Sequence, residues 1–380
     1  MNEYIKELIL KNLGELKNYF LLNYQVIIEF IIKMFILYFG IFSFAALLTI
    51  LERKISALIQ DRVGPEKANI WKFRLWGLFH PIADGIKIIM KEDFIPKNAN
   101  KFMFSLAPII TVFSSLIVFA FIPFGNYIQI LDHKIKLILI ETDIAIFLII
   151  ALSSLAIYGV FMGGVFSANS WGILGSMRAI AQLISYEVIT LISLLPIILI
   201  YTPSTLHDLV EKQSDMFFGI IPNWGIILQP FAFIFFFTAA LCENKRIPFD
   251  VVEGESEIIG YFTEYSSMRF GAFMFAEYIE IIFFSMLITI FFLGGWNVPF
   301  LKDYGFKIFN FVLEIDSKIV YLLELISFII KVFLVSFIII FTRWTLPRFR
   351  FDQILRLSWE YILPLSIANI IFTAILIRII

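Results

Sequence analysis

Long runs of apolar residues alternate with shorter polar segments along almost the whole chain. A helix needs about 20 apolar residues to cross the hydrocarbon core of a bilayer, and eight runs reach or approach that length. They lie at roughly 27–51, 104–124, 144–166, 180–200, 226–242, 270–294, 322–342 and 360–380. Backbone groups in lipid must be hydrogen-bonded within the protein, which favours helices. The pattern therefore predicts an all-α polytopic membrane protein with about eight transmembrane helices.

The first 26 residues differ from the rest because charged and apolar positions are mixed there. We predict an amphipathic N-terminal extension over 1–26, solvated or interfacial, followed by a single transmembrane domain over 27–380. The extension shows no short apolar run with a small-residue cleavage site, so no signal peptide is expected.

Composition narrows the class further. Hydrophobic residues make up 60 % of the chain and charged residues 16 %, which excludes an ordinary soluble domain of this length. The net charge of −1 argues against nucleic acid as a partner. A single cysteine, Cys242, and three scattered histidines cannot supply the ligands of an iron–sulfur cluster or a structural zinc site. We therefore expect no metal and no redox centre on this chain.

The loops fall into two sets with unequal positive charge. One set (52–101, 166–178, 243–265 and 343–356) carries seventeen Lys and Arg residues, whereas the other (1–26, 124–143, 201–225 and 295–321) carries nine. The first set is predicted to face the cytoplasm or the mitochondrial matrix, with both termini on the opposite side. Within its longest loop, Asp84, Lys87 and Lys91 share one helical face. We predict an interfacial helix from Pro81 to Lys91.

An acidic loop interrupts the apolar pattern between 243 and 264. It holds six acids and two bases within 22 residues, between two segments apolar enough to cross a bilayer. Charge at membrane depth is costly and usually marks a proton path, an ion path or a site for a charged partner. Glu253, Glu255 and Glu257 alternate along this loop and are expected to titrate as a coupled group. Arg246 is predicted to be the internal counter-charge of the loop.

A second buried carboxylate is predicted at Glu187, inside the apolar run ISYEVITLISLLPIILI. A carboxylate there is unfavourable unless it is paired or protonated. Two interpretations remain at this point, namely a group that takes up and releases protons, and a structural hydrogen bond to a neighbouring helix.

Four segments on the positive side carry unusual sequence. They are LERKISALIQDRVGP (51–65), NSWGILGSMRAIAQLISYE (169–187), the acidic loop ENKRIPFDVVEGESE (243–257) and TRWTLPRFRFDQ (342–353). In this order and spacing they resemble the membrane subunit of respiratory complex I that is called the H subunit in bacteria and subunit 1 in mitochondria. The acidic loop is similar to the family pattern E-[TN]-x-R-x-P-F-D-x-x-E-x-E-S-E, and the last segment to R-x-x-x-P-R-x-R-[YF]-D-Q. The resemblance covers about 51–364.

The resemblance implies a core subunit of proton-pumping NADH:quinone oxidoreductase that carries no electrons itself. It implies quinone as substrate, with FMN, NADH and iron–sulfur clusters on partner subunits. The expected partners are the hydrophilic subunits at the quinone site, including the one with the terminal iron–sulfur cluster, and the small and antiporter-like subunits of the membrane arm. The expected location is an energy-transducing membrane, and the Phe/Ile/Lys/Asn/Tyr bias slightly favours a mitochondrial inner membrane over a bacterial cytoplasmic one.

The resemblance also implies roles for individual residues. The quinone chamber is expected to involve Glu52, Arg53, Arg62, Asp84, Lys87, Arg246 and Phe249. The proton path and its coupling are expected to use Tyr186, Glu187, Glu243, Asp250, Glu253, Glu255, Glu257, Glu264 and Glu277. Contacts with the hydrophilic arm are expected at Arg178, Arg343, Arg348 and Arg350. Between Glu257 and Glu264 the chain has six residues where the family pattern has seven, and Glu280, Glu324 and Lys331 are not assigned a role.

Simpler interpretations stay open for several of these residues. Glu52 and Arg53 are also placed to anchor a helix end at the interface, and Arg343, Arg348 and Arg350 to act as positive-side anchors. Two other classes of protein are compatible with an acidic loop at membrane depth. One is a free-standing cation- or proton-coupled transporter, although no inverted repeat supports it. The other is the equivalent subunit of membrane-bound hydrogenases.

Overall fold

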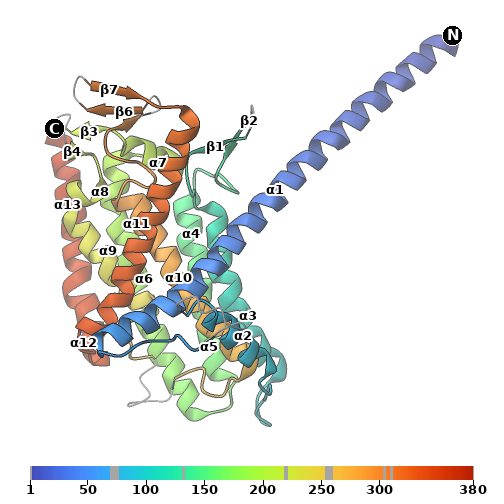
Figure 1. The fold of residues 1–380 in the computed structure, drawn as a ribbon. Helices are drawn as coiled ribbons and strands as arrows, with labels where there is room; N and C mark the ends of the chain where they lie inside the picture. Colours follow the sequence, from blue (N-terminus) through green and yellow to red (C-terminus); the bar gives the residue numbers. More distant parts are fainter. Residues whose placement is uncertain are drawn as a thin grey trace. The chain divides into compact units, whose positions relative to one another are not determined.

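The computed structural model describes residues 2–68, 77–130, 133–217, 221–252, 260–302, 305–308 and 311–379. Two compact units divide the chain, Met1–Ser43 and Phe44–Ile380. Helix α1 (Asn2–Ile59) begins in the first unit and ends in the second. The second unit contains every other element that the structure describes, and its ribbon is drawn in Figure 1.

Helices dominate the second unit. After α1 they are α2 (His80–Met90), α3 (Lys101–Ile117), η1 (Val118–Phe121), α4 (Ala145–Ser153), α5 (Leu155–Val165), α6 (Ser170–Tyr201), α7 (Leu206–Lys212), α8 (Gly225–Leu228), α9 (Pro230–Glu243), α10 (Ser267–Phe292), α11 (Ser317–Thr345), α12 (Phe351–Arg356), the π-helical η2 (Leu357–Ile362) and α13 (Leu363–Ile379). The prediction of a helical polytopic membrane protein is confirmed. Helix α2 also matches the helix predicted over Pro81–Lys91 to within one residue at each end.

Seven helical segments in the described part of the chain are long and apolar enough to span a bilayer, at 28–59, 101–121, 145–165, 170–201, 267–292, 317–345 and 351–379. The fifth of the eight predicted spans, 226–242, is broken at Gln229 into the short helices α8 and α9. Pro230 begins α9, because proline fits the first helical position but cannot continue a preceding helix. The span predicted to begin at 180 begins ten residues earlier, because Asn169 caps α6 by accepting a hydrogen bond from the Trp171 amide.

Helix α10 lies at the centre of the bundle. Of its most apolar stretch, 83 % is buried, compared with 22 % for the last span. It packs against α3, α9 and α11, among others. The outer helices leave apolar side chains such as Ile330 and Leu365 exposed, as expected for surfaces that face lipid. The innermost element is therefore also the one that carries two glutamates, Glu277 and Glu280.

An aromatic cluster fixes the end of the acidic loop against this core. The rings of Phe104 and Tyr265 stack with centroids 3.9 Å apart, and Phe273 meets Tyr265 edge-on at 5.0 Å. Burial raises the pKa of the Tyr265 hydroxyl above its ordinary value. The cluster joins α3 and α10 to the loop that precedes α10, so the two ends of the acidic loop are held by packed helices.

Three small antiparallel sheets lie in the connecting segments. They pair β1 (Tyr127–Ile130) with β2 (His133–Lys136), β3 (Met216–Phe217) with β4 (Ile221–Pro222), and β6 (Gly305–Ile308) with both β5 (Leu301–Lys302) and β7 (Phe311–Glu314). In Figure 1 these hairpins and α7 lie at one end of the bundle, and α2 and α12 lie at the opposite end. Within the second unit, these hairpins belong to one predicted set of loops and α2 and α12 to the other, while the membrane side that each set faces remains a prediction.

Candidate functional site

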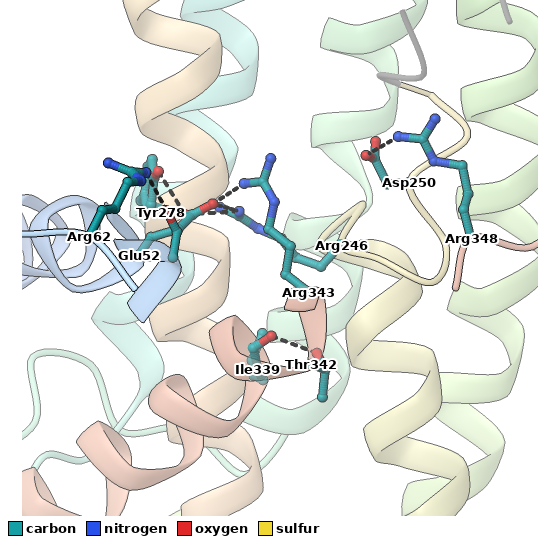
Figure 2. A network of polar contacts seen from close by, with 10 residues as sticks. Glu52, Arg62, Arg246, Asp250, Tyr278, Ile339, Thr342, Arg343 and Arg348 are labelled. Atoms are coloured by element: carbon teal, nitrogen blue, oxygen red, sulfur yellow. Dashed lines mark hydrogen bonds and ion pairs between the residues drawn. The ribbon is translucent and has the colours of Figure 1, made fainter. Parts of the chain in front are cut away.

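A buried ion-pair network centres on the carboxylate of Glu52, near the end of α1. Arg246 Nη1 donates to both carboxylate oxygens of Glu52, at 2.9 and 3.0 Å, and Tyr278 Oη donates to Oε2 at 2.9 Å. Arg343 Nη1 pairs with Oε1. Glu52 and Arg246 are 6 and 7 % exposed. Figure 2 shows these side chains converging from α1, α10, α11 and the loop after α9.

The network carries more positive than negative charge. One carboxylate, Glu52, faces the guanidinium groups of Arg246 and Arg343. The Arg246 guanidinium also lies 5.1 Å from the centroid of the Tyr278 ring, a cation–π distance. Such a group of charges is stable in a buried place only when each member is paired and hydrogen-bonded. Arg246 was predicted to be the counter-charge of the acidic loop; in the described part of the chain its carboxylate partner is Glu52 of α1, whereas Glu253, Glu255 and Glu257 lie outside the described residues.

A second ion pair joins the acidic loop to the arginine-rich turn between α11 and α12. Arg348 Nη2 donates to Asp250 Oδ2 at 2.7 Å (Figure 2), and the Phe349 amide donates to the carbonyl of Pro248 at 2.9 Å. The ring of Phe249 lies 5.7 Å from that of Phe349. Two of the segments singled out in the sequence therefore form one interlocked structure.

The arginines expected to contact the hydrophilic arm have different surroundings. Arg343 and Arg348 have partners within this chain, as described above. Arg350 lies 3.4 Å from Asp352, and its side chain is 76 % exposed. The Arg178 guanidinium lies 5.7 Å from the centroid of the Phe351 ring. Arg350 is the most accessible of the four for another subunit, and the role of all four in docking remains a prediction.

Helix α6 also supports the acidic loop. The Gln182 amide donates to the carbonyls of Cys242 and Phe249, at 3.1 and 2.9 Å. Tyr186 Oη donates to the Ile354 carbonyl at 3.1 Å, and its ring lies 5.6 Å from that of Phe249. Gln182 was not predicted as a site residue. Its only sequence signal is a polar residue one turn before Tyr186 in an otherwise apolar stretch.

The end of α1 carries the other residues expected near the quinone chamber. Arg53 pairs with Asp84 of α2 at 2.6 Å. Arg62 donates to Ser56 Oγ at 3.0 Å and to Gln60 at 2.7 Å. Lys87 lies in the last turn of α2. The structure thus ties α2 to the residue next to Glu52, while Arg62 folds back onto its own helix.

Inside the bundle, a cavity brings together charged residues from three helices and from the loop after α9. Glu187 of α6, Glu243 of α9, Glu280 of α10 and Lys245 line it. Its remaining walls come from Ser115, Val118, Ser153, Ser154, Ala156, Ile157, Val160, Leu183, Phe283 and Phe284. Two of the predicted proton-path residues, Glu187 and Glu243, therefore meet. Glu280 and Lys245 join them without having been predicted as site residues.

The remaining predicted proton-path residues are placed around this cavity or away from it. Glu277 Oε1 lies 3.6 Å from Lys245 Nζ, and both side chains are 5 % exposed or less. Glu264 instead accepts a hydrogen bond of 2.8 Å from Asn169, the residue that caps α6. Glu253, Glu255 and Glu257 lie outside the described residues. In the described part of the chain, no group of three or more His, Cys, Asp or Glu residues is arranged to hold a metal ion.

These features define a class of protein, a polytopic helical membrane protein with an arginine–carboxylate network at one end and a carboxylate-lined cavity within the bundle. A model of the NADH dehydrogenase family matches residues 32–374. The chain belongs to this family.

Relatives within the family agree on the type of subunit, because each is named as an H subunit of NADH-quinone oxidoreductase. The chain is 36 % identical over 354 residues to the H subunit numbered 1 of Cytophaga hutchinsonii, covering 92 % of this chain and 98 % of the relative. It is 39 % identical over 342 residues to the H subunit numbered 2 of Geobacter sulfurreducens, covering 90 and 94 %. It is 36 % identical over 350 residues to the H subunit of Syntrophotalea carbinolica, covering 92 and 96 %. The predicted likeness to this subunit of complex I is confirmed, and these relatives are bacterial.

Proposed function

We propose that this chain is the membrane subunit of a proton-pumping NADH:quinone oxidoreductase that helps to form the quinone chamber and couples quinone reduction to proton translocation. The electrons come from partner subunits that hold FMN and iron–sulfur clusters. This chain supplies the charged groups that respond to the reaction. Its partners are the hydrophilic subunits, the small and antiporter-like membrane-arm subunits, and quinone, in an energy-transducing membrane.

One observation carries the coupling part of the proposal. A single stretch, Glu243 to Asp250, reaches both polar sites. Glu243 and Lys245 line the cavity, Arg246 pairs with Glu52, and Asp250 pairs with Arg348. A change of charge at the end of the bundle is therefore transmitted to the cavity over a few residues of backbone.

The chemistry of quinone reduction supplies such a change. Each quinone takes up two electrons and two protons to become a quinol, so negative charge and proton demand arise together at the chamber. In this proposal the guanidinium groups of Arg246 and Arg343 stabilise the negative charge, and their ion pairs with Glu52 weaken as they do so. The stretch from Glu243 to Asp250 then shifts, and the carboxylates of the cavity exchange protons with the proton carriers of the membrane-arm subunits. Tyr186 and Gln182 hold the stretch against α6 while this happens.

A free-standing transporter is the weaker hypothesis. The family match extends over 32–374, and a transporter would have no need of the arginine-rich turn that is joined to the acidic loop. To decide between the two, the chain is captured from gently solubilised membranes, and the eluate is assayed for NADH:quinone reduction sensitive to a quinone-site inhibitor. Activity together with iron-containing hydrophilic subunits supports the proposal. A chain recovered alone, under conditions that keep other respiratory complexes intact, contradicts it.

The coupling is tested with Glu187→Gln in the assembled complex, reconstituted into vesicles. We expect proton pumping and quinone turnover to fall together while the complex still assembles. Glu360→Gln serves as the matched control, because Glu360 is an exposed carboxylate on the last span. Normal proton pumping by the Glu187→Gln variant would contradict the coupling proposal.

A further inference from the structure

Two of the charged residues that line the cavity lie outside the resemblance to the family. Lys245 occupies the position that the pattern E-[TN]-x-R leaves open, between Asn244 and Arg246. Glu280 follows Glu277 by one turn of α10 and is not part of the matched motif. This chain therefore places one additional base and one additional acid on the walls of the same cavity.

The geometry connects the two residues through Glu277. Lys245 Nζ lies 3.6 Å from Glu277 Oε1 and donates to Tyr261 Oη at 3.2 Å. Residues three apart on a helix share a face, so Glu277 and Glu280 present their carboxylates to the same side of α10. Lys245 is 3 % exposed. The ammonium group is thus held among carboxylates and away from solvent.

A count of charges shows that this region must retain protons. In the described part of the chain, Glu187, Glu243 and Glu280 line the cavity together with Lys245, and Glu277 lies beside the Lys245 ammonium. If all four carboxylates were ionised, the net charge would be −3, which the interior of a membrane protein does not tolerate. Among these described groups, one ionised carboxylate is enough to balance Lys245, and the remaining carboxylates are then favoured in the protonated form.

The hydrogen bonds of Thr190 indicate one place where such a proton lies. Thr190 Oγ1 is 2.9 Å from the Tyr186 carbonyl and 2.5 Å from Glu243 Oε1. A hydroxyl has one hydrogen to donate, and a carbonyl accepts only. The single Thr190 hydrogen serves both acceptors only if it is shared between them, whereas a protonated Glu243 that donates to the Thr190 oxygen leaves that hydrogen to the Tyr186 carbonyl. The short contact therefore fits a protonated Glu243.

The cavity also has room for water between its carboxylates. Its volume is about 40 Å³, and a water molecule needs roughly 10–15 Å³ by this measure. Ser115, Ser153 and Ser154 each donate their own hydrogen to a carbonyl three residues earlier. Their oxygen lone pairs remain available as acceptors for water that bridges the carboxylates.

We propose that Glu280 is an additional proton-carrying carboxylate of this cavity and that Lys245 is the fixed positive charge that keeps one carboxylate ionised. The cavity then stores protons and always retains an acceptor for the next one. This inference rests on the proposed function and names two residues through which it works.

The test uses the assembled complex in vesicles, with Glu280→Gln, Glu280→Asp, Lys245→Met and the control Glu360→Gln. Glu280→Gln is expected to lower pumping-linked turnover by roughly tenfold or more, as loss of a positioned proton-transfer group does. Glu280→Asp is expected to recover much of it, because an acid is restored. Lys245→Met removes the positive charge that keeps one carboxylate ionised as a proton acceptor. Proton pumping by this variant is therefore expected to fall at every pH tested.

Infrared difference spectra, recorded while quinone is reduced, separate a proton carrier from a structural residue. A band of protonated carboxylic acid is expected to change in the wild type and to be lost in Glu280→Gln. The inference is overturned if Glu280→Gln pumps normally with an unchanged spectrum, or if Glu280→Asp is as impaired as Glu280→Gln in an assembled complex. Glu187→Gln, measured in parallel, shows whether the coupling proposal itself has failed. If only Glu187→Gln is impaired, the failure is confined to the role of Glu280.

Discussion

Glu52 and Arg246 are 194 residues apart in the sequence, yet their side chains share two hydrogen bonds of 2.9 and 3.0 Å in a buried place. The contact joins the first span to the loop between α9 and α10. It also holds this loop next to Arg343, which pairs with the same carboxylate, and Tyr278, which donates a hydrogen bond to it. One carboxylate thus joins four parts of the chain.

Replacement of this carboxylate is expected to weaken the whole complex. In Glu52→Gln, Arg246 keeps its buried charge without its partner, and breaking a buried ion pair in this way costs about 3–5 kcal/mol. The thermal midpoint of the purified complex and the amount assembled in membranes should both fall. The neighbouring Arg53→Gln is the control, since Arg53 is half-exposed and its pair with Asp84 contributes only about 0–1 kcal/mol. Equal stability of the two variants would refute the central role of Glu52.

Lys331 stabilises the end of the central helix. Its ammonium donates to the carbonyls of Leu293, Gly295 and Asn297, at 2.8, 2.9 and 2.7 Å. These carbonyls follow the end of α10, where backbone acceptors lack partners within the helix. Lys331→Met should lower the free energy of unfolding by about 3 kcal/mol, the value of one or two hydrogen bonds to a charged group.

The matched control is Lys318→Met, which removes an exposed lysine from the start of the same helix. It should change stability by no more than about 0.5 kcal/mol. Thermal unfolding in mild detergent measures both variants. If Lys331→Met is no less stable than Lys318→Met, the three hydrogen bonds do not support the helix end.

Close packing of α5 on α6 depends on Gly164. A Cβ there would overlap the Ser176 side chain and lie 2.5 Å from the carbonyl of Gly172, so the two helices would have to separate. Gly164→Ala should cost about 1–3 kcal/mol, the usual penalty of overpacking.

Gly85→Ala is the comparison, because Gly85 lies inside α2 with nothing within 4 Å of an added Cβ. Alanine forms helix better than glycine, so this variant should gain about 0.5–1 kcal/mol. Opposite signs of the two changes in thermal midpoint are therefore expected. A gain in stability from Gly164→Ala would show that α5 and α6 are packed less closely than described.

His207 should make the protein less stable in mild acid. Burial between the rings of Tyr127 and Trp296 lowers the pKa of His207, and the nearby carboxylate of Glu211 offsets this only in part. The unfolded chain, with an ordinary histidine pKa of about 6.5, then binds protons more readily than the folded one. The stabilisation is complete above about pH 6.5 and is lost as the pH falls through the lower folded pKa.

The measurement is the thermal midpoint as a function of pH, from about 8 to 5, for the wild type and for His207→Gln. The wild type should lose more stability on acidification than the variant, since the variant has no imidazole to protonate. Parallel curves would show that His207 has the same pKa in the folded and unfolded states.

The sequence predicted the long helices well because an apolar run of sufficient length has few alternatives in a membrane. It failed where a single contact decides the outcome. The cap at Asn169 starts α6 early, and Pro230 shortens α9. The hairpins in the connecting loops were also missed, because those loops carried no turn signal strong enough to stand out.

The sequence predicted many residues of the candidate site but not their contacts. Motifs marked Glu52, Arg246, Glu187 and Glu243 as residues of interest, and the structure brings them into two groups. The ion-pair partners of these residues could not be predicted from the sequence, because a charged residue in an apolar run has the same sequence signature whatever it contacts. Lys331 and Glu280 were therefore left without a role, and the pairing of Arg246 with Glu52 required the fold.

The network around Glu52 also dictates an order of events during synthesis. Glu52 belongs to the first span, whereas Arg246 and Tyr278 are made about two hundred residues later and Arg343 almost three hundred residues later. Until those segments leave the ribosome, the Glu52 carboxylate lacks these partners, and its burial without them would be costly. The network around Glu52 is complete only after α11 has been inserted. A ribosome that stalls before residue 343 would leave the first helix in place and the network incomplete.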